Sequence, residues 1–93
     1  MTKRNITGCY IDKEQKVPIK GFIELTDLDD RTFKLMWRVY YENDNNLAGK
    51  GRAFFHGGNP PSIDEMFEKG IEDLRKYRSG RRRIFEQIEF ISP

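Results

Sequence analysis

The chain has 93 residues, a formal net charge of +2 and a single cysteine, and 37% of its residues are hydrophobic. This length suits one domain, and one Trp, four Tyr and seven Phe are enough large side chains to build a core. No apolar run is long enough for a membrane span or a signal peptide, and the lone Cys9 excludes an internal disulfide. We therefore expect one soluble domain, residues 1–93, in the reducing cytoplasm and without membrane contact.

The first 56 residues predict four β-strands. Alternating apolar and polar positions, or short apolar runs, cover residues 6–12, 19–25, 33–41 and 47–56. The segments between them are polar and rich in Asp, Asn and Lys, as turns are. Because such short turns join antiparallel neighbours, the strands are expected to form a meander. The third strand has the clearest face: Phe33, Leu35, Trp37, Val39 and Tyr41.

Two glycines indicate where the side chain of Trp37 lies. Matching the faces of successive strands gives a register in which Trp37 pairs with Gly21 on one side and with Gly51 on the other. An indole needs room on a pleated surface, and a glycine on each side provides it. We therefore predict that Trp37 is buried beneath the helix. The same register pairs Leu25 with Phe33 and Tyr41 with Leu47.

The next predicted element is a helix. Ser62 is a good N-cap, and Glu65, three residues later, completes a capping box. Gly70 falls on the apolar stripe, where it would allow close approach of a bulky side chain such as Trp37. Gly80 is the expected C-terminal stop. The stripe consists of Ile63, Met66, Phe67, Ile71, Leu74 and Tyr77.

A last strand is predicted over residues 84–91, after a short basic turn. The order of elements is then β-β-β-β-α-β. We predict an α+β fold, in which an antiparallel β-sheet meander of four to five strands has one α-helix packed on one face. The other face of the sheet is expected to be at least partly open to solvent.

A block of cations follows the predicted helix. Six of the nine residues from position 75 to position 83 are cationic, while the rest of the chain holds 11 cations and 15 acidic residues. Positive charge localised in this way suits a phosphate backbone or an acidic protein surface. A solvated helix end with favourable cations is the alternative interpretation. The six cations are Arg75, Lys76, Arg78, Arg81, Arg82 and Arg83.

The sheet face that points away from the helix carries further cations. The predicted register aligns Lys20, Arg38 and Lys50 in one row across three strands, with Arg52 in the next row. Cations interleaved with aromatic residues are typical of surfaces that stack bases and hold phosphates. Alternatively, the N-terminal segment or a second copy in a homodimer covers the apolar residues of this face. These apolar residues are Phe22, Met36, Tyr40 and Phe54.

Residues for catalysis or metal binding are few. The one cysteine, Cys9, and the one histidine, His56, lie on different predicted strands, and no third side chain completes a nucleophile–base set. A metal site needs several ligands of these types. The sequence therefore predicts no enzymatic activity, no cofactor and no metal site.

The order of three strands and a helix, together with the hairpin of residues 40–51, resembles the later part of a double-stranded-RNA-binding domain. Such domains begin their last helix with basic residues. Here Asp64, Glu65 and Glu68 lie early in the helix, and a further strand follows it. The resemblance therefore implies no role for any residue of this chain.

These patterns together predict a small non-enzymatic binding module. The first expected partner is nucleic acid, bound through the basic helix end and the basic-aromatic sheet face. The alternative is a protein-binding regulator or inhibitor that uses the exposed sheet face. A nucleic-acid interface would join the arginine block to the sheet cations, whereas a protein interface would show a flat apolar patch remote from the arginines.

Overall fold

A computed structural model describes residues 2–29, 31–57, 61–79 and 82–91 of the chain. Its elements are β1 (Thr2–Asp12), β2 (Gln15–Asp29), β3 (Thr32–Tyr41), β4 (Leu47–His56), α1 (Ile63–Lys76), β5 (Arg78–Ser79), β6 (Arg82–Arg83) and β7 (Phe85–Phe90). The bounds of β3 and β4 agree with the prediction to within one residue, whereas β1 and β2 are longer than predicted. The short strand β5 occupies the predicted end of the helix, and β6 lies in the segment that was predicted to be a basic turn.

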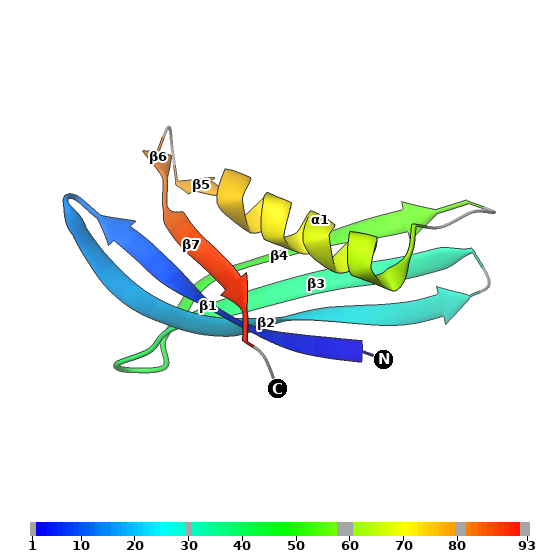
Figure 1. The fold of residues 1–93 in the computed structure, drawn as a ribbon, viewed down its shortest axis with the longest axis horizontal. Helices are drawn as coiled ribbons and strands as arrows, with labels where there is room; N and C mark the ends of the chain where they lie inside the picture. Colours follow the sequence, from blue (N-terminus) through cyan, green and yellow to red (C-terminus); the bar gives the residue numbers. More distant parts are fainter. Residues whose placement is uncertain (1, 30, 58–60, 80–81, 92–93) are drawn as a thin grey trace.

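Five of the strands form one antiparallel sheet, in the order β4-β3-β2-β1-β7. Strands β1 to β4 build a meander, and α1 then crosses one face so that β7 returns beside β1 (Figure 1). The predicted α+β fold is confirmed, with its one helix placed after the fourth strand. Within the described residues, no helix is long and apolar enough to cross a membrane.

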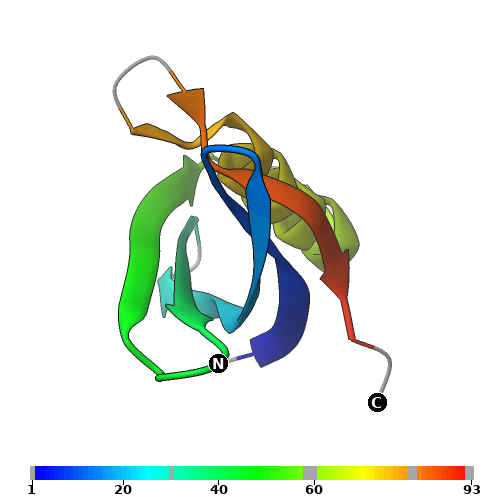
Figure 2. The ribbon, with the colours of Figure 1, turned by 90° about the vertical axis from the view of Figure 1, so that its left-hand side faces the viewer.

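The core lies between α1 and the face of the sheet that this helix covers. Figure 2 shows the sheet curling, so that its two edge strands, β4 and β7, face each other across the interior. They come close enough that a Cβ atom on Gly49 of β4 would lie 2.9 Å from the ring of Phe85 on β7. The buried apolar residues are Ile6, Ile19, Ile23, Leu25, Leu35, Trp37, Val39, Met66, Phe67, Ile71, Leu74, Ile84, Phe85 and Ile88.

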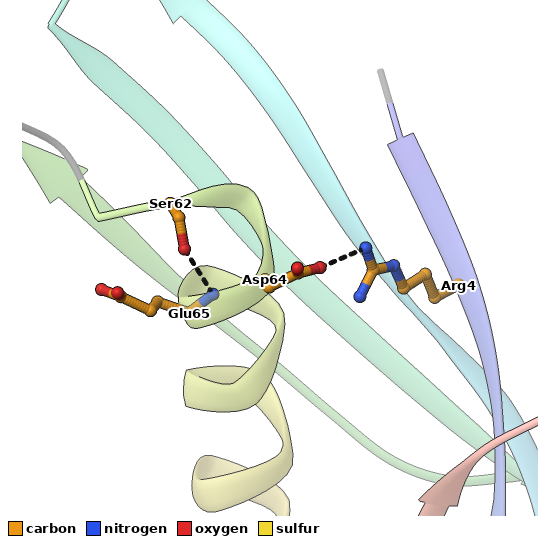
Figure 3. A network of polar contacts seen from close by, with 4 residues as sticks. All are labelled: Arg4, Ser62, Asp64 and Glu65. Atoms are coloured by element: carbon orange, nitrogen blue, oxygen red, sulfur yellow. Dashed lines mark hydrogen bonds and ion pairs between the residues drawn. The ribbon is translucent and has the colours of Figure 1, made fainter.

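The start of α1 confirms Ser62 as the N-cap, whereas, within the described part of the chain, the Glu65 side chain does not make the second bond of the predicted capping box. The Oγ atom of Ser62 accepts a hydrogen bond from the backbone N–H of Glu65 at 3.2 Å (Figure 3). This bond satisfies one of the N–H groups that have no partner inside a helix. The predicted stripe faces the sheet, except that Ile63 in the first turn is 49% exposed.

The end of α1 comes earlier than predicted. The helix stops at Lys76 because Tyr77 adopts an extended backbone conformation. The Tyr77 ring then packs edge-on against Trp37, with 5.2 Å between the centroids, and lies nearly parallel to Phe85. Gly80, which was predicted to be the stop, lies outside the described residues.

Arg4 of β1 holds the start of α1 from the sheet side. Its Nη2 atom donates a hydrogen bond to Oδ1 of Asp64 at 2.7 Å (Figure 3), and its guanidinium lies 4.4 Å from the centre of the Phe67 ring. The ion pair itself is largely exposed, so we expect most of the stabilisation to come from the contact with the aromatic ring.

Gly70 allows α1 to approach the sheet closely, as predicted, but the side chains that it meets are not the predicted one. A Cβ atom on Gly70 would lie 3.0 Å from two carbons of Ile23 and 3.5 Å from Leu35. Trp37 was predicted to be the neighbour of Gly70 and is not among these contacts. Aliphatic residues of β2 and β3 therefore fill the space beneath the middle of α1.

Trp37 is buried as predicted, with 3% of its surface exposed. It lies opposite Gly51, where an added Cβ atom would come within 2.6 Å of the indole. The predicted pairing with Gly21 is wrong, because the register between β2 and β3 is shifted by two residues and Gly21 lies opposite Val39. A shift of two residues keeps every side chain on its predicted face.

A cluster of aromatic rings closes one end of the core. Tyr10 packs edge-on against both Tyr41 and Phe85, with centroids 5.3 and 6.0 Å apart. Burial raises the pKa of Tyr41, and the neighbouring Tyr10 and the carboxylates of Asp12 and Asp44 raise it further. The Tyr41 hydroxyl therefore stays protonated throughout the neutral range.

Candidate functional site

The sheet face opposite α1, here called the outer face, carries the strand cations that were predicted to bind a ligand. Its register between β3 and β4 is the predicted one over this region, but Leu47 lies opposite Tyr40 rather than the predicted Tyr41, because the ladder shifts after Val39. Arg38 lies opposite Lys50, and Met36 lies opposite Arg52. Arg38 therefore lies two positions from Met36 on β3, while Lys50 and Arg52 lie across from these two residues on the edge strand β4.

A hollow of about 530 Å³ lies over these residues. Lys34 also lines it, so four cations surround the Met36 side chain. Within the described part of the chain, none of the four forms an ion pair. Glu24 lies opposite Met36 on β2 but is not part of the lining. The lining residues are Lys34, Met36, Arg38, Lys50, Gly51 and Arg52.

Lys20 is not in the row where the sequence predicted it. Phe22 occupies that place opposite Arg38, and Lys20 lies one row farther along β2, opposite Tyr40. There it lines a second, shallower hollow of about 350 Å³ together with Phe22 and Tyr40. The structure therefore places Lys20 beside the four-cation hollow rather than within it.

The apolar residues of the outer face lie on a diagonal across three strands. Phe22 is on β2, Met36 is one row farther on β3, and Phe54 is one row farther again on β4. Cations lie beside this diagonal on the same face. Lys3 of β1, which was not predicted as a contact, places its ammonium group 5.0 Å from the centre of the Phe22 ring. The outer face therefore mixes cations with apolar side chains.

Two of these contacts were missing from the predicted site. Lys34 alternates with Met36 and Arg38 along β3, so the strand pattern already placed it on the outer face. Lys3 lies outside the predicted bounds of the first strand, which began four residues too late. The polar alternation of Lys3, Asn5 and Thr7 is the signal that would have extended that strand.

The arginine block forms a small ribbon rather than the predicted turn. Arg75 is exposed in the last turn of α1, and β5 pairs with β6 so that Arg78 lies opposite Arg83. Arg82 is the other residue of β6, and Arg81 lies outside the described residues. Figures 1 and 2 show the ribbon beyond the C-terminal end of α1, away from the outer face. The fold therefore does not join the block to the sheet cations.

Cys9 and His56 lie at opposite ends of the sheet. The ladder pairs Cys9 with Pro18 at one end of β2, while His56 and its partner Thr32 lie beside Asp29 at the other end. Eleven residues of extended strand separate these positions, a distance of roughly 35 Å. The two side chains of one molecule therefore cannot act as a nucleophile and its base. Instead, the Cys9 thiol donates to Oε1 of Gln87 at 3.3 Å.

Among the residues that the structure describes, no three His, Cys, Asp or Glu side chains gather as metal ligands. Comparison with protein-family models, curated proteins and solved structures finds no significant match for this chain. The function therefore has to be inferred from the surface of the molecule.

Proposed function

We propose that the protein is a non-enzymatic module that binds nucleic acid through the outer face of β2, β3 and β4. The observation that carries the proposal is the hollow in which four cations surround Met36. These cations have no ion-pair partner among the described residues, so an external anion would relieve the mutual repulsion that remains beside Glu24 of the neighbouring strand. A phosphate group is an anion that lysine and arginine side chains bind well.

The spread of the charge favours a polymer over a small anion. Lys20 and Lys3 carry further positive charge on β2 and β1, beyond the four-cation hollow, although Glu24 lies between the hollow and Lys3. A small anion would use one cluster, whereas a phosphate backbone uses cations distributed over several strands. The aromatic residues between the cations provide contacts to bases in addition to phosphates.

A protein partner is the second candidate. The diagonal of Phe22, Met36 and Phe54, of which Phe54 is exposed and the other two are partly buried, is the feature that would serve it. These side chains are interleaved with cations, which favours nucleic acid. The arginine ribbon lies away from the outer face, which removes one of the arguments for nucleic acid. A protein partner or a second copy is therefore the conclusion if the following binding test fails.

Replacing Arg38, Lys50 and Arg52 together by glutamine is expected to weaken nucleic-acid binding strongly. The slope of log K against log salt concentration is negative, and each lost phosphate contact on a single strand reduces its magnitude by about 0.7. Loss of three contacts should therefore reduce the magnitude of the slope by about 2. The measurement is fluorescence anisotropy of a labelled oligonucleotide between about 50 and 200 mM salt.

The matched control replaces Lys13, Arg31 and Lys69 by glutamine, which removes the same charge from two exposed turns and from the solvent side of α1. The control variant should keep the wild-type slope. Equal losses in the two variants would mean that net charge, rather than the outer face, determines binding. No binding by the wild type at low salt would reject nucleic acid as the partner.

Replacing Arg81, Arg82 and Arg83 together by alanine tests the ribbon separately. We expect weaker binding to all sequences, because phosphate contacts carry no sequence information. The melting curve in circular dichroism should not shift to lower temperature, since removing three like charges that are adjacent in the sequence removes repulsion. An unchanged affinity and an unchanged salt slope would remove the ribbon from the interface.

A further inference from the structure

Phe54 and His56 extend the outer face beyond the four-cation hollow. Phe54 is 46% exposed and lies opposite Lys34, which lines the hollow. The rings of Phe54 and His56 are nearly parallel, with an angle of 19° between their planes and 6.2 Å between their centroids. The Thr32 Oγ1 atom lies 3.5 Å from Nδ1 of His56, at the upper limit of a hydrogen bond. The result is an aromatic surface at the end of β4.

This aromatic surface lies next to the cations that line the hollow. Arg52, which lines the hollow, precedes Phe54 by two residues on β4, and alternate residues of a strand share a face. Two residues of strand correspond to about 7 Å. Lys34 is the cross-strand neighbour of Phe54, so cations flank the ring along the strand and across it. An anionic group held in the hollow therefore lies next to an exposed aromatic ring.

Resting on the function proposed above, we infer that the ligand is single-stranded, with a phosphate in the hollow and an adjacent base stacked on Phe54. Every base has a π-face, so an aromatic ring accepts any of them. In a duplex the faces of internal bases are covered by their neighbours and only the edges are accessible in the grooves. The outer face consists of strands lying side by side, which is a platform for unpaired bases rather than an element that enters a groove.

The test compares three labelled probes of about 12 nucleotides. They are a single strand, a duplex, and a single strand whose bases have been removed from the sugars. The probe without bases keeps the phosphates and loses the groups that would stack. We expect the wild type to bind the single strand most tightly. Phe54→Leu should weaken that binding by roughly 5- to 150-fold and bring it towards the affinity of the probe without bases.

The matched control is Ile63→Ala, because Ile63 has nearly the same exposure, 49%, but lies on α1 at the other side of the sheet. It should bind all three probes as the wild type does, and Phe54→Trp should restore tight binding. Equal wild-type affinity for the single strand and for the probe without bases would overturn the stacking inference, while the proposed function stands. No effect of Phe54→Leu would also overturn it. Failure of all three probes to bind would reject the proposed function itself.

Discussion

Replacing Trp37 by alanine is expected to lower the free energy of unfolding by about 3–5 kcal/mol. The indole is 3% exposed and packs edge-on against Tyr77 and Phe85, so its removal leaves a cavity that rigid neighbours cannot fill. Because small domains have total stabilities of about 5–15 kcal/mol, the variant should be near the limit of folding. The measurement is a urea or thermal melt followed by circular dichroism.

The control for this variant is Phe54→Ala, which removes an exposed aromatic residue from the neighbouring strand. It should change the stability by no more than about 0.5 kcal/mol, as surface substitutions usually do. Trp37→Phe should lose less than Trp37→Ala, since most of the packing remains. An unchanged melting temperature in Trp37→Ala would contradict the position of this side chain in the core.

Gly21→Ala is expected to destabilise the sheet even though it adds only one methyl group. The new Cβ atom would lie 2.1 Å from the backbone oxygen of Arg38 and 2.8 Å from Cα of Val39. These are backbone atoms of the paired strand β3, so relief requires the two strands to move apart. Such overpacking typically costs about 1–3 kcal/mol, and we expect a value near the top of that range.

Lys20→Ala provides the comparison for Gly21→Ala, because Lys20 is the preceding residue of β2 and its side chain is exposed on the outer face. It should leave the denaturation midpoint almost unchanged. A stabilised Gly21→Ala variant would mean that the gain in strand propensity exceeds the steric conflict, and would contradict the close approach of β2 and β3 at this point.

The sequence predicted the elements well where a chemical signal marks their ends. The bounds of β4 and the N-cap at Ser62 were correct, because Asn-rich and Pro-rich segments precede them. The burial of Trp37 opposite Gly51 was also correct, since only a residue without a side chain fits there. These predictions depend on local features, which a single sequence displays directly.

The register between β2 and β3 was wrong because alternation cannot detect a shift of two residues. The predicted pair was Leu25 with Phe33, and the observed pair is Leu25 with Leu35. Both put the same residues on the same faces, so the hydrophobic pattern is equally satisfied. The ladder between β2 and β3 is irregular between Asp27 and Asp29, and no residue type in this segment predicts the irregularity.

The composition of the outer face was predicted better than its arrangement. Strand alternation placed Arg38, Lys50 and Arg52 on one face, and the structure brings them together around Met36. The separation of the arginine block from that face follows from the position of α1 on the opposite face of the sheet, because the block continues directly from the end of this helix. The early end of α1 at Lys76 was not predicted, since it accompanies tertiary packing of the Tyr77 side chain.

The position of β1 between β2 and β7 has a consequence for how the chain folds. β7 joins residues that are more than seventy positions away from it in the sequence, such as Ile6 with Phe90. Contacts of such high sequence separation slow folding, because a long loop must close before they form. During synthesis the meander can pair before β7 emerges from the ribosome, and β1 is then an open edge strand. We expect this nascent intermediate to be the state most prone to aggregation, because an unpaired edge pairs readily with other chains.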